Sequence, residues 1–290
     1  MIDGLVVVDK PAGWTSHDVV ARCRRIFGQK RVGHAGTLDP GATGVLLVGL
    51  GQATRLLRFL GALSKSYEGE VVLGTETSTL DDEGEVVATH AMAAVTVADV
   101  RSAAAGLIGE IDQVPPMVSA VKVGGRRLHE LARKGIEVDR KARRVHVEAF
   151  DVEATPDPSV FRIAVECSAG TYVRVLAADL GQALGGGAHL RRLRRTAIGS
   201  FHLDRARPLD AVGPDAVLAP AAVVEHLESC RVDTELAASV AHGRVLALDA
   251  LRPMGAGPWA VLDRGGALLA VYEAHRDQRA KPSVVLVADR

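Results

Sequence analysis

The order of apolar and polar residues along the chain predicts both strands and helices. Several segments are apolar runs of strand length, and the segment from Ser66 to Leu73 nearly alternates apolar residues with glutamates. Short apolar runs indicate buried strands, and alternation indicates a strand with one face toward solvent. The strands expected in the first two thirds of the chain are residues 4–8, 43–50, 66–73, 145–153 and 160–168.

Capping residues mark where helices are expected to begin. Ser16, with Asp18 in the following turn, predicts a helix that runs to about Phe27. Thr96 followed by Asp99 resembles a capping box, with Asp in place of Glu. Further helices are expected at 53–60, at 126–134 before Gly135, and from Thr171 to about Leu184.

These elements do not follow a regular strand–helix alternation, so we expect an α+β fold with a mixed, largely antiparallel sheet and flanking helices. Prolines and a glycine break the periodicity at about 205–220. A boundary there divides the chain into residues 1–210 and 221–290. The second part holds short strand-like runs at 244–248, 258–262, 267–272 and 283–287, which predict a small β module.

Of the 290 residues, 48% are hydrophobic, which is enough to form the core of a globular protein. The 35 basic and 35 acidic residues balance, so no overall charge indicates a nucleic-acid partner. Charge is nevertheless segregated, because residues 122–144 carry many more basic than acidic side chains and residues 191–195 hold four arginines. Each run alone is typical of a solvated surface. Two such runs beside one candidate site favour a polyanionic substrate.

The three cysteines are far apart and predict neither a disulfide framework nor a zinc site. The N-terminal residues lack the pattern of a signal peptide. No apolar run reaches the ~20 residues needed to span a bilayer. We therefore expect a cytoplasmic protein.

The segment from His34 to Gly44 concentrates small and rigid residues around one carboxylate, that of Asp39. Asp-Pro-Gly by itself is typical of a turn. The density of glycines around it also suits a loop whose backbone a bulky ligand approaches closely.

This segment resembles the catalytic loop of the pseudouridine synthases. Four further motifs are Asp9–Ser16, Lys65–Tyr67, Gly170–Arg174 and Gly187–Arg195. They resemble motifs of the TruB family, the tRNA pseudouridine-55 synthases, and the resemblance runs in the same order over about residues 2–200. Residues 115–122 are similar to the start of that family's RNA-gripping insertion, expected near 115–144.

The resemblance implies a pseudouridine-synthase fold and a reaction without cofactor or metal. Uridine becomes pseudouridine when the N1–C1′ bond breaks and the uracil rejoins through C5. Asp39 is then the catalytic carboxylate, and Arg174 is the partner that keeps it ionised, because a buried carboxylate without a partner tends to protonate. Direct attack on C1′ and a glycal route through loss of the C2′ proton both stay open.

The resemblance also assigns the residues that hold RNA. Tyr67 packs against the target base and is a candidate general base, Tyr172 contacts the uracil, and Leu193 packs on the flipped nucleotide. His34 lies at the RNA surface and helps to hold the flipped state, while Lys10 contacts either RNA phosphate or the loop that bears Asp39. Phosphate contacts are expected from Lys122, Arg126, Arg127, Arg133, Lys134, Arg191 and Arg192.

The expected substrate is uridine 55 in the T-arm of tRNA, bound by a monomer without a guide RNA or an obligatory protein partner. The C-terminal module is similar in position to a PUA RNA-binding domain. One alternative is the same reaction on another RNA or with an RNA guide. Another is an RNA-binding protein with a vestigial site, which predicts loss of the set Asp39, Tyr67 and Arg174; all three residues are present.

Overall fold

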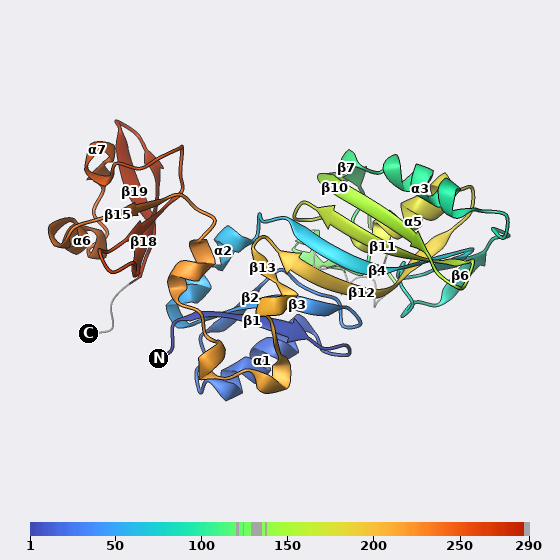
Figure 1. Cartoon of the computed structure of the whole chain (residues 1–290), viewed down its shortest axis with the longest axis horizontal. Helices are drawn as coiled ribbons and strands as arrows, with labels where there is room; N and C mark the ends of the chain where they lie inside the picture. Colours follow the sequence, from blue (N-terminus) through green and yellow to red (C-terminus); the bar gives the residue numbers. More distant parts are fainter. Residues whose placement is uncertain (120–121, 124, 129–134, 137, 287–290) are drawn as a thin grey trace.

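The computed structural model describes the whole chain apart from residues 120–121, 124, 129–134, 137 and 287–290 (Figure 1). Its helices are α1 Ser16–Ile26, α2 Leu57–Leu60, α3 Val97–Ala105, α5 Val173–Ala183, α6 Thr234–Ala241 and α7 Leu248–Leu251. The strands of the first part are β1 Gly4–Lys10, β2 Val32–Ala35, β3 Thr43–Leu50, β4 Lys65–Leu73, β5 Thr75–Thr77, β6 Val86–Thr89, β7 Gly109–Gln113, β8 Lys122–Val123, β9 Arg126–Arg127, β10 Arg143–Ala154, β11 Val160–Cys167, β12 Ala188–Ile198, β13 Phe201–His202 and β14 Arg207–Pro208. The strands of the last part are β15 Ser229–Arg231, β16 Leu246–Ala247, β17 Trp259–Leu262, β18 Leu268–His275 and β19 Arg279–Val285.

A ten-stranded sheet dominates the described residues. Its main path runs β14-β1-β3-β12-β4-β11-β10-β7, with β13 paired to β12 and β2 paired to β3. Two pairs, β1–β14 and β12–β3, are parallel, and the others are antiparallel. The expected α+β class with a largely antiparallel sheet is confirmed.

Different helices pack on the two halves of this sheet. Helices α3 and α5 pack on the half formed by β4, β10, β11 and β12, where their apolar residues join one buried cluster (Figure 1). Helix α1 covers β1 and β3 in a second cluster. Strands β3 and β12, which meet at the middle, therefore bring together segments that are far apart in the sequence.

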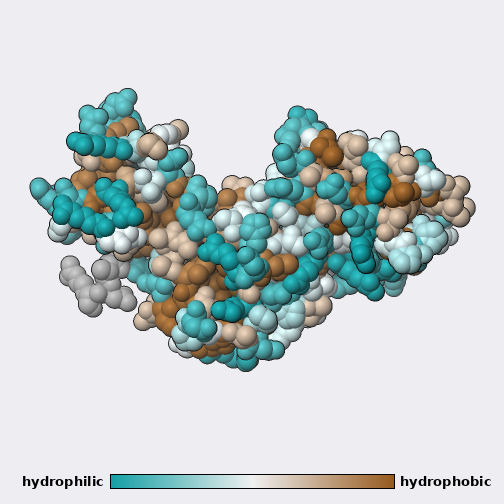
Figure 2. All heavy atoms as spheres, viewed as in Figure 1, coloured by the Kyte–Doolittle hydropathy of each residue, from teal (hydrophilic) through white to brown (hydrophobic). Residues whose placement is uncertain are grey.

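A second sheet, of five strands in the order β15-β17-β18-β19-β16, follows in the C-terminal part. One buried cluster contains Leu268 and Val271 from this sheet together with Leu56 and Leu60 from the region of α2. The Arg58 guanidinium also lies 3.7 Å from the Glu273 carboxylate. The C-terminal module thus packs directly on the first part beside α2, and the two form a continuous body in Figure 2.

Several expected boundaries shift for local reasons. The cap of α1 is Thr15 rather than Ser16, because the Thr15 hydroxyl and the Asp18 carboxylate form a reciprocal capping box. The box at Thr96 and Asp99 is present before α3. The expected helix 126–134 begins instead with β9, paired to β8, and most of its remaining residues lie outside the described part.

No described helix combines the length and apolar character required to cross a membrane.

Candidate active site

The loop between β2 and β3 carries Asp39 and is fixed at several points. Arg195 on β12 donates from Nη2 to the Gly36 carbonyl at 3.0 Å, and from Nε to the Val45 carbonyl at 2.8 Å. The Ser16 hydroxyl accepts from the Leu38 amide at 2.9 Å. The backbone before and after Asp39 is therefore held by groups from α1 and β12, so the carboxylate is positioned in advance.

Lys10 completes this anchoring. Its side chain is 0% exposed, and Nζ donates to the carbonyls of Pro11, Trp14 and Pro40 at 2.9, 2.6 and 3.1 Å. Burial lowers the pKa of Lys10 to about 8, although the Asp39 carboxylate opposes the shift. In this position Lys10 contacts the loop of Asp39, which is one of the two roles considered for it. An RNA phosphate cannot reach the ammonium group here without displacing a carbonyl.

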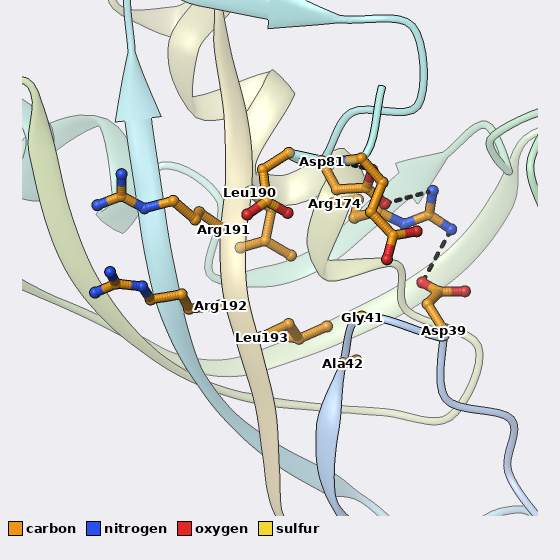
Figure 3. A pocket seen from close by; sticks show the side chains of 11 residues that line it. Asp39, Gly41, Ala42, Asp81, Arg174, Leu190, Arg191, Arg192 and Leu193 are labelled. Carbon is orange, nitrogen blue, oxygen red and sulfur yellow. Dashed lines mark hydrogen bonds and ion pairs between the residues drawn. The ribbon is translucent and has the colours of Figure 1, made fainter. Parts of the chain in front are cut away.

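Arg174, in the first turn of α5, faces the Asp39 loop. Its guanidinium lies 3.1 Å from an Asp39 carboxylate oxygen and 3.3 Å from one of Asp81 (Figure 3). It also donates to the carbonyls of Thr79 and Val118, both at 2.8 Å. The side chain is only 5% exposed. Four acceptors from three segments thus fix both the place and the direction of this cation.

Asp39 opens into a pocket, with 41% of its side chain exposed. Partial burial nevertheless raises the pKa of its carboxyl group, the Arg174 charge lowers it, and the Asp81 charge raises it again. Burial has the largest effect on this pKa, and the Arg174 charge is the strongest of the influences that favour the ionised carboxylate.

Tyr67, on β4, lines the same pocket, and its ring is buried. Burial raises the pKa of its hydroxyl group, with the neighbouring Arg195 acting in the opposite direction. The hydroxyl group therefore stays protonated at neutral pH. This favours a role in packing or hydrogen-bond donation over one as a general base.

Tyr172 and Leu193 border the pocket as well, which has a volume of about 300 Å³. Tyr172 caps α5, and its backbone amide donates to the Gln113 side chain at 2.9 Å. Gln113 in turn donates to the Tyr172 carbonyl at 3.3 Å. The described structure thus brings together Asp39, Tyr67, Arg174, Tyr172 and Leu193 around one space.

The other expected RNA-binding residues lie outside this space, although Arg191 and Arg192 line an adjoining pocket together with Asp39 (Figure 3). His34, on β2, is edge-on to His17 with ring centres 5.2 Å apart, and burial is the main cause that lowers its pKa to about 4. Arg191 and Arg192 both contact Glu70. Arg133 and Lys134 lie outside the described residues, and the side chains of Lys122, Arg126 and Arg127 do as well.

Sequence reasoning did not single out Asp81 or Gln113, and it treated Ser16 as a helix cap and Arg195 as part of a basic cluster. Asp81 was missed because its chain segment comes to Arg174 only through the fold, in a loop that pairs with Leu190. Ser16 and Arg195 did fall within quoted motifs. Their signal was the motif itself, without indication that they hold the loop of Asp39.

Comparison with known proteins identifies the family of this chain. Residues 24–173 match the TruB family pseudouridylate synthase (N terminal domain), and residues 174–229 match the tRNA pseudouridylate synthase B C-terminal domain. A tRNA pseudouridine synthase B of Mycobacterium sp. (strain KMS) is 49% identical over 290 residues, covering 98% of this chain and 96% of the relative. One of Thermobifida fusca (strain YX) is 45% identical over 295 residues, covering 98% and 99%.

Solved structures agree too. A chain of a Cbf5-Nop10-Gar1 complex superposes with a TM-score of 0.75 at 28% identity, covering 99% of this chain and 84% of that one. A chain of an H/ACA RNP bound to a substrate RNA containing 2′-deoxyuridine gives 0.74 at 25%, covering 99% and 85%. The protein therefore belongs to the TruB family of pseudouridine synthases.

Proposed function

We propose that this protein isomerises uridine 55 in the T-arm of tRNA to pseudouridine, with Asp39 as the catalytic carboxylate. The observation that carries the proposal is the Asp39–Arg174 pair at 3.1 Å, at the edge of a pocket that Tyr67, Tyr172 and Leu193 also line. A carboxylate held ionised beside aromatic and apolar side chains suits a flipped, planar base.

The reaction needs a group that relieves electron deficiency at C1′ when the N1–C1′ bond breaks. An ionised Asp39 does this by attacking C1′, as carboxylates do in glycoside hydrolysis. Alternatively it removes the C2′ proton and gives a glycal. In the first route the Asp39–C1′ bond breaks as C5 bonds to C1′, and in the second C2′ regains its proton at that step. In both routes the C5 proton then leaves to solvent and N1 gains a proton, so no electrons and no group donor are required.

In this proposal, the side chains around Asp39 orient the carboxylate and bind the flipped nucleotide. Arg174 holds the carboxylate ionised and directed, while Tyr67 and Tyr172 offer flat surfaces for the uracil. Leu193 gives an apolar contact for the flipped nucleotide. The bound RNA would complete the cover of this partly open pocket and so protect the intermediate from water, because hydrolysis competes with rejoining.

We propose that the enzyme acts on tRNA in the cytoplasm, as a monomer without a guide RNA or a protein partner. The support is that curated relatives named tRNA pseudouridine synthase B match almost the whole chain. Phosphate contacts come from the basic residues near 122–144, and His34 at the loop helps to hold the flipped state.

Asp39→Asn tests the proposal. With tRNA tritiated at uracil C5, the variant should release no tritium above background while binding tRNA within about twofold of the wild type, because a neutral amide neither attacks C1′ nor takes a proton. Asp157→Asn, in an exposed turn, is the matched control and should be fully active. Turnover by Asp39→Asn would exclude the assignment. Mapping pseudouridine at nucleotide resolution in the product distinguishes uridine 55 from other positions.

A further inference from the structure

A one-residue bulge in β12 decides which of its side chains reach the active site. Before the bulge Arg191 pairs with Glu70, and after it Arg194 pairs with Glu68, so three steps along β12 match two along β4. Side chains alternate along a strand, and one extra residue reverses the face of all that follow. Leu193 thereby turns to the face of Tyr67.

Arg195 depends on the same reversal. It pairs with Tyr67 across the sheet and lines the pocket together with Leu193. Without the extra residue, both side chains would point to the opposite face of the sheet. The Asp39 loop would then lose the guanidinium that holds the Gly36 carbonyl.

At the bulge, the backbone of Arg192 has a conformation that an arginine rarely adopts. Arg192 has a φ of 56°, in the left-handed region that side chains other than glycine seldom adopt. A contact from outside the bulge must therefore hold it.

Glu70, on the neighbouring strand, provides that contact. One carboxylate oxygen lies 2.7 Å from Arg191 Nη2, and the other lies 3.2 Å from Arg192 Nη1. The Glu70 side chain is 13% exposed, whereas that of Arg192 is 71% exposed. In Figure 3 both arginines point away from Asp39, while Leu193 points toward Gly41.

We propose that Glu70 is a positioning residue, which clamps the Arg191–Arg192 bulge and so keeps Leu193 against the flipped nucleotide. The inference rests on the proposed function, because it acts through the role given there to Leu193. A rival explanation is that Arg191 and Arg192 bind RNA phosphate and Glu70 only tunes their charge. The two explanations differ in what they change: the clamp governs turnover of bound tRNA, and the phosphate contact governs affinity.

The experiment measures single-turnover tritium release at saturating enzyme, together with the Kd for tRNA. Glu70→Gln keeps the shape but removes the charge, and we expect turnover about tenfold slower with Kd within twofold. Glu70→Asp, which retains the charge, should recover part of the rate. The control Glu68→Gln changes an exposed carboxylate of β4 for which no ion pair is found among the described residues, and it should react at the wild-type rate.

Two combined variants test the route through the bulge. Adding Glu70→Gln to Leu193→Ala should slow turnover by much less than the product of the two single effects, because one of the two side chains that the clamp positions is already gone. Adding Arg192→Gly to Glu70→Gln should restore turnover, because glycine adopts a φ of 56° without a clamp.

The proposal is overturned if Glu70→Gln changes Kd and leaves the turnover rate unchanged. It is also overturned if the rate of the Glu70→Gln/Leu193→Ala double variant falls by the product of the two single effects, or if adding Arg192→Gly to Glu70→Gln slows turnover further. Melting temperature and circular dichroism identify a variant that fails to fold, and Glu70→Asp then supplies the test. If the wild type releases no tritium, the proposed function fails. If the wild type is active and Glu70→Gln matches it, only the clamp fails.

Discussion

Asp39 and Arg174 depend on each other, since either side chain alone would be unfavourable in its surroundings. Arg174 is almost fully buried between two carboxylates and two carbonyls, and Asp39 has a raised pKa in spite of this cation. Removing one member of such a pair leaves the other uncompensated. The pair therefore links the reactivity of Asp39 to pH.

Arg174→Met makes that link measurable. The reactive carboxylate exists above the pKa of Asp39 and is lost as pH falls through it; this pKa already lies above the ordinary value. Without Arg174 the pKa should rise further, because the charge that lowers it is removed. We expect the acidic limb of the single-turnover rate to move to higher pH.

The control is Arg101→Met, which removes a guanidinium that donates to the Val152 carbonyl away from the site. Its acidic limb should coincide with that of the wild type. An unmoved limb in Arg174→Met would mean that Asp39 does not set the acidic limb.

At the scale of elements, the parallel contact of β3 with β12 requires a glycine. Gly44 has a φ of 102°, and a Cβ there would lie 2.1 Å from the Arg195 carbonyl oxygen. The two strands therefore approach each other through a position that has no room for a side chain. This approach brings the loop of Asp39 to Arg195.

Gly44→Ala should consequently destabilise the protein by more than the backbone cost alone. Gly28→Ala is the matched control, with a φ of 60° but no atom within 4 Å of the added Cβ, and it should cost about 1 to 2 kcal/mol. We expect Gly44→Ala to exceed this by at least ~2 kcal/mol in urea denaturation, because strand separation adds to backbone strain. Equal losses for the two variants would contradict the close approach.

Strand β12 is an element that the pattern of apolar and polar residues did not predict. Its segment from Ala188 to Ile198 holds four arginines and gave no strand prediction, although it lies at the centre of the sheet. Two register shifts against β4 interrupt its alternation, and its arginines are held by partners on other strands. Helix α3, by contrast, was predicted from its cap because a capping box is a local interaction.

At the scale of the whole molecule, the C-terminal module shares a core with the first part. Val271 is fully buried in the cluster that also holds Leu60 and Phe201. Figure 2 shows this module as one end of a continuous body. Such packing couples the unfolding of the two parts.

We therefore expect one calorimetric transition for the chain. Val271→Ala should lower its midpoint by a few degrees while keeping it single, because deleting buried methyl groups costs about 1 to 3 kcal/mol. Val86→Ala, at an exposed position on β6, should leave the midpoint unchanged. Two separate transitions in the wild type would show that the modules unfold independently.

The affinity for tRNA should depend on the basic segment 122–144. Charge reversal at Arg126 and Arg127 should weaken binding and reduce the slope of log Kd against log salt by roughly one to two, because fewer counterions are released. Titration at several salt concentrations measures the slope. If the variant had the same slope as the wild type, the surface that binds RNA would have to lie outside this segment.

The sequence by itself determined the capping box of α3, most of the long strands, the α+β class and the family, because these follow from local interactions and from motifs in order. It also supplied Asp39, Tyr67 and Arg174 as candidates. Only the tertiary structure decided that Arg174 forms an ion pair with Asp81 as well as with Asp39. It also decided that Lys10 and Arg195 hold the Asp39 loop, and that a bulge turns Leu193 toward the site. These contacts join residues that are distant in sequence, and a change of one residue in strand register would remove several of them.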